Sequence, residues 1–221
     1  MRYNFNWPVV WRNFDRLTYG LALGLAMAVV ALVLGCIIGV ALAACRQSRN
    51  PFLRLPAAAF VEVVRNTPLL LLVFFVYYGL PELGISAFDN IESFIAALTL
   101  YSGAYLTEVF RGGLAAIPAA YIEAGRAIGL TRWQRLIYVV LPVLFRIVLP
   151  SLSSALISLF KDTALAAAIG VPELTFGARW INVNTFQVLE TWITAAGMYL
   201  AACYIIAFAL RGLERRYAMV R

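Results

Sequence analysis

The stretch Thr18–Cys45 reads TYGLALGLAMAVVALVLGCIIGVALAAC and holds no charged side chain. A helix of about 20 apolar residues crosses the roughly 30 Å hydrocarbon core of a bilayer, so this stretch is long enough to span it. Thr191–Leu210 is also free of charge. Of the 221 residues, 63% are hydrophobic and 13% charged, against about 25% charged in ordinary soluble domains. The composition predicts an all-α integral membrane protein and excludes a soluble enzyme.

Residue types that commonly act in catalysis or bind metals are scarce in this chain. The chain has no histidine, which removes Ser/His and Cys/His catalytic pairs and a favoured zinc ligand. Cys36, Cys45 and Cys203 lie in or beside apolar segments at spacings that form no metal motif, and we interpret them as packing residues. We therefore expect no catalytic residue, no metal and no cofactor in this chain.

Five apolar segments predict about five transmembrane helices. They cover residues 18–44, 57–81, 92–113, 137–160 and 188–210. Residues 1–17, with Trp7, Trp11 and Phe14 between arginines, form a predicted N-terminal segment at the outer membrane interface. We recognise no cleavable signal peptide in it, because the first apolar stretch is far longer than a signal core. The whole of 1–221 is treated as a single transmembrane domain.

The distribution of arginine predicts the orientation. Of the 18 basic residues, 17 are arginines scattered over segment ends, so membrane orientation explains the net charge of +7 better than nucleic acid does. The connection Cys45–Pro56 holds three arginines and no acid, whereas Glu82–Glu92 holds three acids and no base. By the positive-inside rule, 11 basic residues face the cytoplasm and 5 face outside. We expect an outside N-terminus and a cytoplasmic C-terminus.

Charges inside predicted spans mark candidate sites, because each costs about 2.5–3.5 kcal/mol near the bilayer centre. Glu62 and Arg65 are three residues apart and able to pair on one helix face. They form either a structural ion pair or a polar wall of a solute pathway. Pro68, directly after Asn66 and Thr67, removes a backbone hydrogen bond, and broken helices of this kind occur at transport sites.

Lys161, Asp162 and Thr163 follow the fourth apolar segment. Either they end the span in water at the outer face, or they lie below that surface. In the second case they offer an ammonium to a carboxylate and a carboxylate to an amine, which complements a zwitterion. Glu108 is a further charge in a span, interpreted as a packing or snorkelling residue.

The segment Glu123–Arg135 reads EAGRAIGLTRWQR and precedes Leu141-Pro142. Its composition predicts a short helix, a turn at glycine and a polar second helix. On the residues alone, it is either a surface helix on lipid or a knob that docks into a partner.

This segment resembles the EAA loop of permease subunits of ATP-binding-cassette (ABC) importers, whose pattern is EAA, three residues, G, nine residues, I, one residue, LP. Five residues fit in register: Glu123, Ala124, Gly129, Leu141 and Pro142. Gly125 replaces an alanine and Val139 replaces the isoleucine. The resemblance implies that residues 119–136 form a cytoplasmic loop that couples to an ATPase through Glu123, Ala124, Gly125, Ala127 and Gly129.

Within that superfamily the chain is most similar to the polar amino acid uptake subfamily, over about residues 15–215. The matching blocks are Arg65–Leu70, Gly79–Pro81, Tyr105–Pro118, Lys161–Thr163 and Gly170-Val171. The subfamily often has glutamine near 72, glycine and glutamine at 120 and 121, and serine at 164. This chain has Leu72, Ala120, Tyr121 and Ala164 there.

The resemblance implies a type I ABC importer permease fold in a bacterial inner membrane and the transport of polar amino acids. It also implies a second permease subunit, identical or homologous, two cytoplasmic ATPase subunits and a solute-binding protein outside. ATP would be bound by the partners, since this chain lacks the Gly-x-x-x-x-Gly-Lys-Ser/Thr pattern.

The candidate pathway residues are Glu62, Thr67, Lys161, Asp162 and Thr163. Two alternatives stay open. One is an ATP-independent channel or secondary carrier. The other is an intramembrane enzyme that uses Glu62, Lys161 and Asp162.

Overall fold

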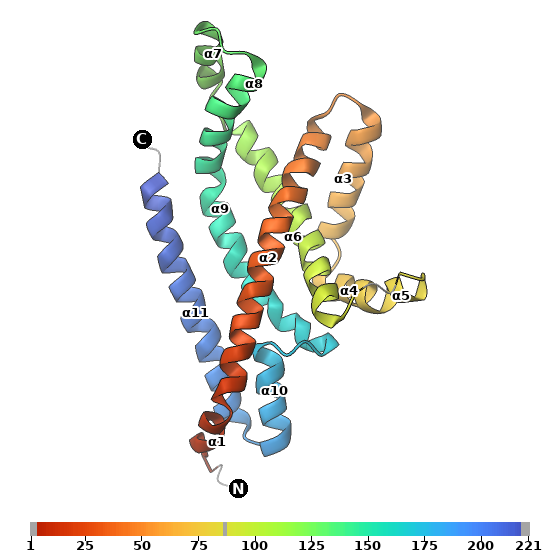
Figure 1. The fold of residues 1–221 in the computed structure, drawn as a ribbon, viewed down its shortest axis with the longest axis vertical. Helices are drawn as coiled ribbons and strands as arrows, with labels where there is room; N and C mark the ends of the chain where they lie inside the picture. Colours follow the sequence, from red (N-terminus) through yellow and green to blue (C-terminus); the bar gives the residue numbers. More distant parts are fainter. Residues whose placement is uncertain (1–3, 86–87, 218–221) are drawn as a thin grey trace.

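The computed structural model describes residues 4–85 and 88–217, and every regular element among them is helical (Figure 1). The helices are α1 (Trp7–Arg12), α2 (Phe14–Gln47), α3 (Pro51–Arg65), α4 (Leu69–Phe74), α5 (Leu80–Glu82), α6 (Asn90–Ala115), α7 (Ala119–Ala127), α8 (Arg132–Arg135), α9 (Leu141–Asp162), α10 (Leu174–Thr185) and α11 (Val188–Tyr217). Two π-helical segments, η1 (Phe75–Gly79) and η2 (Leu136–Val140), and one 3₁₀ segment, η3 (Thr163–Ile169), join some of them.

Four helical stretches are long and apolar enough to cross a membrane: Phe14–Gln47, Asn90–Ala115, Arg132–Ile169 and Val188–Arg216. They coincide with four of the predicted spans. The remaining predicted span, 57–81, is a bent pair of helices, Pro51–Arg65 and Leu69–Glu82, with a bend of 108° between them. Pro68 causes the break, since it has no N–H to donate and disfavours a helical residue before it. The number of spans is five if this bent pair counts as one.

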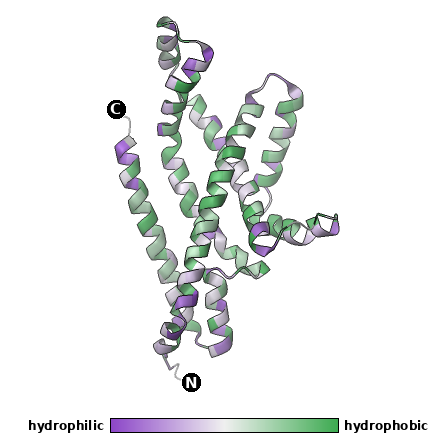
Figure 2. Cartoon of the chain, viewed as in Figure 1, coloured by the Kyte–Doolittle hydropathy of each residue, from purple (hydrophilic) through white to green (hydrophobic). Residues whose placement is uncertain are grey.

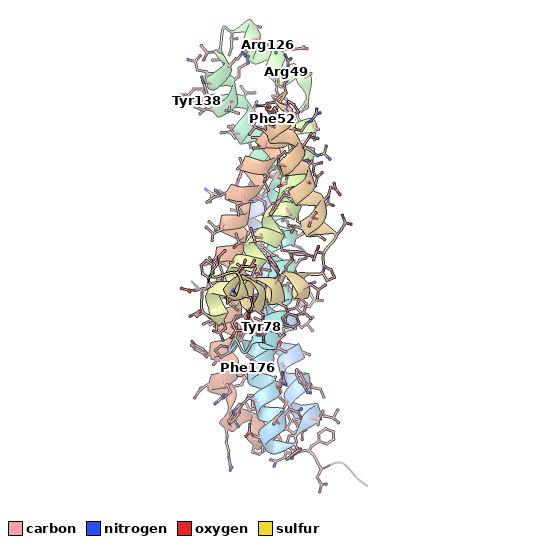
Figure 3. All side chains as sticks on the ribbon, turned by 90° about the vertical axis from the view of Figure 1, so that its right-hand side faces the viewer. Arg49, Phe52, Tyr78, Arg126, Tyr138 and Phe176 are labelled. Atoms are coloured by element: carbon pink, nitrogen blue, oxygen red, sulfur yellow. The ribbon has the colours of Figure 1, made fainter. Side chains whose placement is uncertain are left out.

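The arginine-rich segments gather at one end of the molecule. The α2–α3 connection, the α7–α8 loop and the C-terminal end of α11 lie at the top of Figure 1, and α1 and α10 lie at the bottom. Figure 2 shows hydrophilic residues at these ends, and also around α5 and the start of α6, with hydrophobic ones along most of the long helices. Arg49 and Arg126, far apart in the sequence, are both near the top of Figure 3. This arrangement agrees with a single arginine-rich side, and the sidedness itself stays a prediction.

Two Leu-Pro pairs explain the π-helical segments. η1 directly precedes Leu80-Pro81, and η2 directly precedes Leu141-Pro142. A proline cannot donate to the carbonyl four residues earlier, and its ring crowds that carbonyl. The helix accommodates the proline by widening for one turn, a recognised cause of local irregularity in helices.

Close approach of α2 and α6 forms the centre of the fold. Ser102 Oγ on α6 donates a hydrogen bond to the carbonyl oxygen of Ala31 on α2, at 2.9 Å. A Cβ placed on Gly39 would lie 2.9 Å from Leu106 Cβ. Glycine and serine at a helix contact let two backbones pack closely, which is the usual means of helix association in membranes.

The end of the molecule opposite the α7–α8 loop contains a helix that the sequence analysis missed. Glu173 begins α10 and is fully buried, and its carboxylate accepts hydrogen bonds from the backbone N–H groups of Thr175 (2.8 Å) and Phe176 (2.7 Å). The hydroxyl of Tyr199 on α11 donates to the same carboxylate at 2.8 Å. Glu173 therefore caps α10 and joins it to α11.

The N-terminal segment packs partly against this end. Val10 and Leu17 are buried with Leu174 and Ile181 of α10. Trp11 is 64% exposed, so its predicted place at the membrane interface stays a prediction. Residues 1–3 of that segment lie outside the described residues.

We predict that Gly20→Ala destabilises the protein. A Cβ at position 20 would lie 2.5 Å from the carbonyl carbon of Glu173, a backbone atom that cannot turn aside. Overpacking of this kind costs about 1–3 kcal/mol in the free energy of unfolding. Thermal unfolding of the purified protein in detergent measures the effect. Gly197→Ala is the control, because a Cβ there meets nothing within 4 Å, and equal melting temperatures for the two variants would contradict the prediction.

Candidate functional site

The break between α3 and α4 holds three of the polar residues singled out in the sequence. Glu62 is exposed, and its carboxylate accepts a long hydrogen bond from Asn66 Nδ2, at 3.5 Å. The Cζ atom of Arg65 lies 5.4 Å from the centroid of the Tyr105 ring on α6. Of the two readings left open in the sequence, the ion pair between Glu62 and Arg65 is not formed among the described residues, because α6 offers Arg65 an aromatic surface. Their place on a solute pathway stays a prediction. Thr67 donates to the carbonyl of Val63 at 2.8 Å, so its hydroxyl is used locally.

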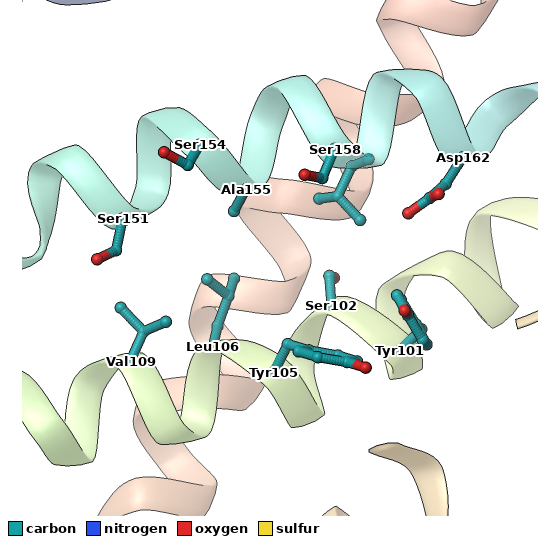
Figure 4. Close-up of a pocket in the computed structure, with 11 residues that line it drawn as sticks. Tyr101, Ser102, Tyr105, Leu106, Val109, Ser151, Ser154, Ala155, Ser158 and Asp162 are labelled. Carbon is teal, nitrogen blue, oxygen red and sulfur yellow. The ribbon is translucent and has the colours of Figure 1, made fainter. Parts of the chain in front are cut away.

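A cleft with both polar and apolar walls lies between α6 and α9 (Figure 4). Its volume is about 310 Å³, at the lower end of the roughly 300–1,000 Å³ of small-molecule sites. Three serines and one aspartate line it from α9, and two tyrosines and a serine line it from α6. They are Ser151, Ser154, Ser158 and Asp162 facing Tyr101, Ser102 and Tyr105.

The cleft lies near the middle of the longest apolar helix. Ser102, one of its wall residues, contacts Ala31 at the midpoint of α2. Among the residues that the structure describes, Asp162 is the only charged side chain that lines the cleft. The next residue, Thr163, packs against Gly24 of α2, so Asp162 lies toward one end of the cleft and still within the apolar length of α2. A charged side chain within a span is costly unless it faces water or a ligand, and such residues mark solute or ion pathways by default. The cleft is therefore the leading candidate for the site where a polar solute rests.

Lys161 and Thr163 do not join Asp162 in this cleft. Lys161 lines a separate groove between α9 and α11, with Tyr199, Cys203 and Tyr204. Thr163 is fully buried, and its hydroxyl donates to the carbonyl of Phe160 at 2.6 Å. The three residues therefore do not share one cavity, since successive residues of a helix point about 100° apart. That they line a solute pathway stays a prediction. Glu62 lines neither of these two cavities. The three residues of the enzyme alternative, Glu62, Lys161 and Asp162, therefore do not meet in one cavity.

Glu108 joins α2 to α6 beside the cleft. Its Oε1 accepts from Arg46 of α2, and its Oε2 accepts from Nε and Nη2 of Arg111, at 2.9 and 2.6 Å. The side chains of Arg46 and Glu108 are only 18% and 20% exposed. This carboxylate is therefore a clamp between two helices, whereas the sequence suggested a packing or snorkelling residue.

We predict that Glu108→Gln loosens this clamp. The amide keeps the shape of the side chain but loses the charge, and hydrogen bonds to charged groups contribute about 1.5–3 kcal/mol to stability. The free energy of unfolding in a denaturing-detergent titration should fall by a similar amount. Glu62→Gln serves as the matched control because Glu62 is exposed and forms no ion pair among the described residues. Equal stability of the two variants would rule out the clamp.

The predicted coupling loop is a compact helix–turn–helix. α7 ends before Gly129, whose φ of +80° places it in the left-handed region, and α8 begins with a capping box between Thr131 and Gln134. Glu123, Ala124 and Ala127 are exposed. Gly125 is buried, and a Cβ there would lie 3.2 Å from Arg135 Cγ. The glycine that replaces the alanine of the EAA pattern thus lets α7 pack closely on the stem of Arg135.

Comparison with known proteins connects this architecture to a family. Residues 31–219 match the family described as "binding-protein-dependent transport system inner membrane component". The chain belongs to this family. It is accordingly an inner-membrane protein with several spans.

Relatives in this family cover almost the whole chain. The glutamine transport system permease protein GlnP of Escherichia coli (strain K12) is 37% identical over 217 residues, 96% of this chain and 97% of its own. The L-cystine transport system permease protein TcyB of Bacillus subtilis (strain 168) is 34% identical, covering 95% and 90%.

Solved structures agree with the fold. A structure described as an amino acid ABC transporter with histidines superposes with a TM-score of 0.89 and 28% identity, covering 97% of this chain and 100% of that one. The inward-facing MetNI methionine ABC transporter gives a TM-score of 0.78 at 21% identity, which shows the fold alone. The predicted type I ABC importer permease fold is confirmed.

Of the polar cleft residues, Asp162 was singled out in the sequence, whereas the serines and tyrosines were missed. Ser151, Ser154, Ser158 and Asp162 recur at intervals of three and four within an apolar segment, and Tyr101 and Tyr105 are four apart. That spacing places each set on one helix face. This polar stripe on one face of an apolar helix is the sequence pattern that could have predicted the cleft.

Proposed function

We propose that this chain is the permease subunit of an ATP-driven importer of polar amino acids. The observation that carries the proposal is that one helical run, Arg132–Ile169, contains both α8 of the coupling loop and the serine–aspartate wall of the cleft. A movement of the loop is therefore transmitted to the cleft along a continuous stretch of helix.

The chemistry of the cleft fits a polar amino acid. Asp162 is suited to the solute's ammonium group, and the serine and tyrosine hydroxyls both donate and accept hydrogen bonds to neutral polar groups. The relatives are named for the transport of glutamine and cystine, which supports the same class of solute for this chain. Of the other predicted pathway residues, Glu62 and Thr67 lie at the helix break and Lys161 lies in the neighbouring groove.

Lys161 supports a second permease subunit, identical or homologous. It is exposed on the surface of this chain beside Tyr199 and Cys203, in the middle of the apolar part of α11. Exposure of an ammonium group to lipid at that depth costs several kcal/mol of free energy. We infer that a partner permease, or the aqueous pathway between the two permeases, covers it.

The remaining partners are two cytoplasmic ATPase subunits and a solute-binding protein on the opposite side. The α7–α8 loop lies at the arginine-rich end of the molecule (Figure 1). We infer that Glu123, Ala124, Gly125, Ala127 and Gly129 form the part of α7 and its turn that docks on an ATPase. ATP hydrolysis belongs to those subunits, and coupling requires that ATP stabilise one arrangement of the docked complex over another.

The ATPase activity of the assembled complex tests this function. The chain is purified with its co-expressed partners, reconstituted in lipid and given its binding protein, with and without L-glutamine and a panel of other polar amino acids. The proposal expects at least one of them to raise the rate of ATP hydrolysis. Failure of the chain to co-purify with any ATPase, or a rate indifferent to every amino acid, would refute it.

A further inference from the structure

Arg65 is a cation next to the cleft with an unused hydrogen-bond donor. It lies at the last turn of α3, directly before the 108° break. Its Nε atom is buried and has no hydrogen-bond partner among the described residues. Leaving a donor of a charged group buried and unpaired is costly, so this atom calls for a partner that the chain itself does not supply.

The carboxylates near Arg65 are already engaged. Asn66 contacts the exposed carboxylate of Glu62, and Arg46 and Arg111 bind the two oxygens of Glu108. Glu108 is close enough for Arg65 to influence it electrostatically. Arg46 and Arg111 thus both contact Glu108, and together with Arg65 they outnumber the two carboxylates of this region, Glu62 and Glu108.

The contact with Tyr105 brings Arg65 to the edge of the cleft. The Cζ atom of Arg65 lies 5.4 Å from the centroid of the Tyr105 ring, and Tyr105 is a wall residue of the cleft. An aromatic face leaves the N–H groups in the plane of a guanidinium available for hydrogen bonds, and Nε with a neighbouring Nη forms a fork that matches a carboxylate once a turn of the side chain exposes the buried Nε. Among the described residues, the lining of the cleft includes one anion, Asp162, and no cation, while Lys161 lines another groove.

We propose that Arg65 binds the α-carboxylate of the transported amino acid. Asp162 then attracts the positive end of the solute from α9, while Arg65 and Tyr105 provide the opposite charge from the α3 break and α6. The assignment rests on the proposed function, and it replaces Lys161 as the cation that completes recognition of a zwitterion. Arg65 would be a specificity-determining residue of the permease itself.

Direct solute binding tests this assignment. The purified permease–ATPase complex, without the binding protein, is titrated with L-glutamine and with L-glutaminamide, which lacks only the carboxylate. Wild type should bind glutamine about 10- to 100-fold more tightly, the value of a charge-assisted hydrogen-bonded pair. Arg65→Gln should bind the two compounds within about twofold of each other, and Arg65→Lys should keep part of the preference.

Controls separate binding from packing. Arg65→Met keeps the apolar stem of the side chain, and it should lose the preference for glutamine while retaining the melting temperature. Arg146→Gln removes an exposed arginine of α9 that does not line the cleft, and it should behave as wild type. If Arg65→Gln still preferred glutamine as strongly as wild type, or weakened both compounds equally, the assignment would be overturned. The proposed function, which depends on stimulated ATP hydrolysis, would then stand unaffected.

Discussion

Asp162→Asn is expected to reduce amino acid uptake by about 10- to 100-fold at low solute concentration, while the complex still assembles. In the described part of the chain, Asp162 is the one charged residue that lines the cleft, and its carboxylate is the group suited to a solute ammonium. A charge-assisted hydrogen bond contributes about 1.5–3 kcal/mol, which corresponds to that range. Initial rates of uptake into proteoliposomes, measured over a range of solute concentrations, give the effect on affinity and on maximal rate.

Lys161→Met is the matched control for this prediction. Lys161 is the adjacent residue on α9, but it lines the groove toward α11, so its replacement should change solute affinity much less than Asp162→Asn does. Equal losses of affinity in the two variants would show that Lys161 and Asp162 belong to one solute site. Unchanged affinity in Asp162→Asn would remove the cleft as the resting place of the solute.

Gly129→Val is expected to lower the rate of ATP-driven uptake by about 5- to 30-fold or more. Gly129 has a φ of +80°, and a Cβ there meets nothing within 4 Å, so the effect of a side chain would be purely conformational. The left-handed conformation costs an L-residue roughly 1–2 kcal/mol, which sets that range, and β-branched residues tolerate it least. The turn between α7 and α8 would then leave the arrangement that docks on the ATPase.

Gly129→Asn distinguishes this cause from a general intolerance of side chains. Asparagine adopts the left-handed region more readily than other residues, so this variant should retain most of the uptake. Co-purification of the ATPase with each variant shows whether docking or a later step is affected. Full uptake by Gly129→Val would show that the turn geometry is not needed for coupling.

The spans were predictable because apolar length is a local property of the sequence. The charge-free stretches became α2 and α11, and Pro68 marked the break in the second span. The residues of 123–135 predicted a turn at glycine, and the resemblance to the EAA loop assigned Gly129 its place in that pattern. α10 was missed although Leu174, Ala178 and Ile181 have helical spacing, since the helix is too short to register as a span.

The site was less predictable because its contacts join distant residues. Arg65 has an acid at a pairing distance along its own helix, and only the packing of α3 on α6 shows that it selects Tyr105 instead. Lys161 and Asp162 are adjacent in sequence, yet helical rotation sends them into different cavities. Likewise, Glu108 pairs with Arg46 across 62 positions, a partner that no local pattern indicates.

Uptake of radiolabelled amino acid into proteoliposomes that contain the complete complex tests the central claim most directly. The binding protein and L-glutamine or another activating amino acid are placed on one side, and ATP is enclosed on the other, with ionophores present to dissipate ion gradients. We expect uptake that requires enclosed ATP and persists without any ion gradient. Uptake that needs no ATP but disappears when the gradients are dissipated would contradict the account and identify a secondary carrier instead.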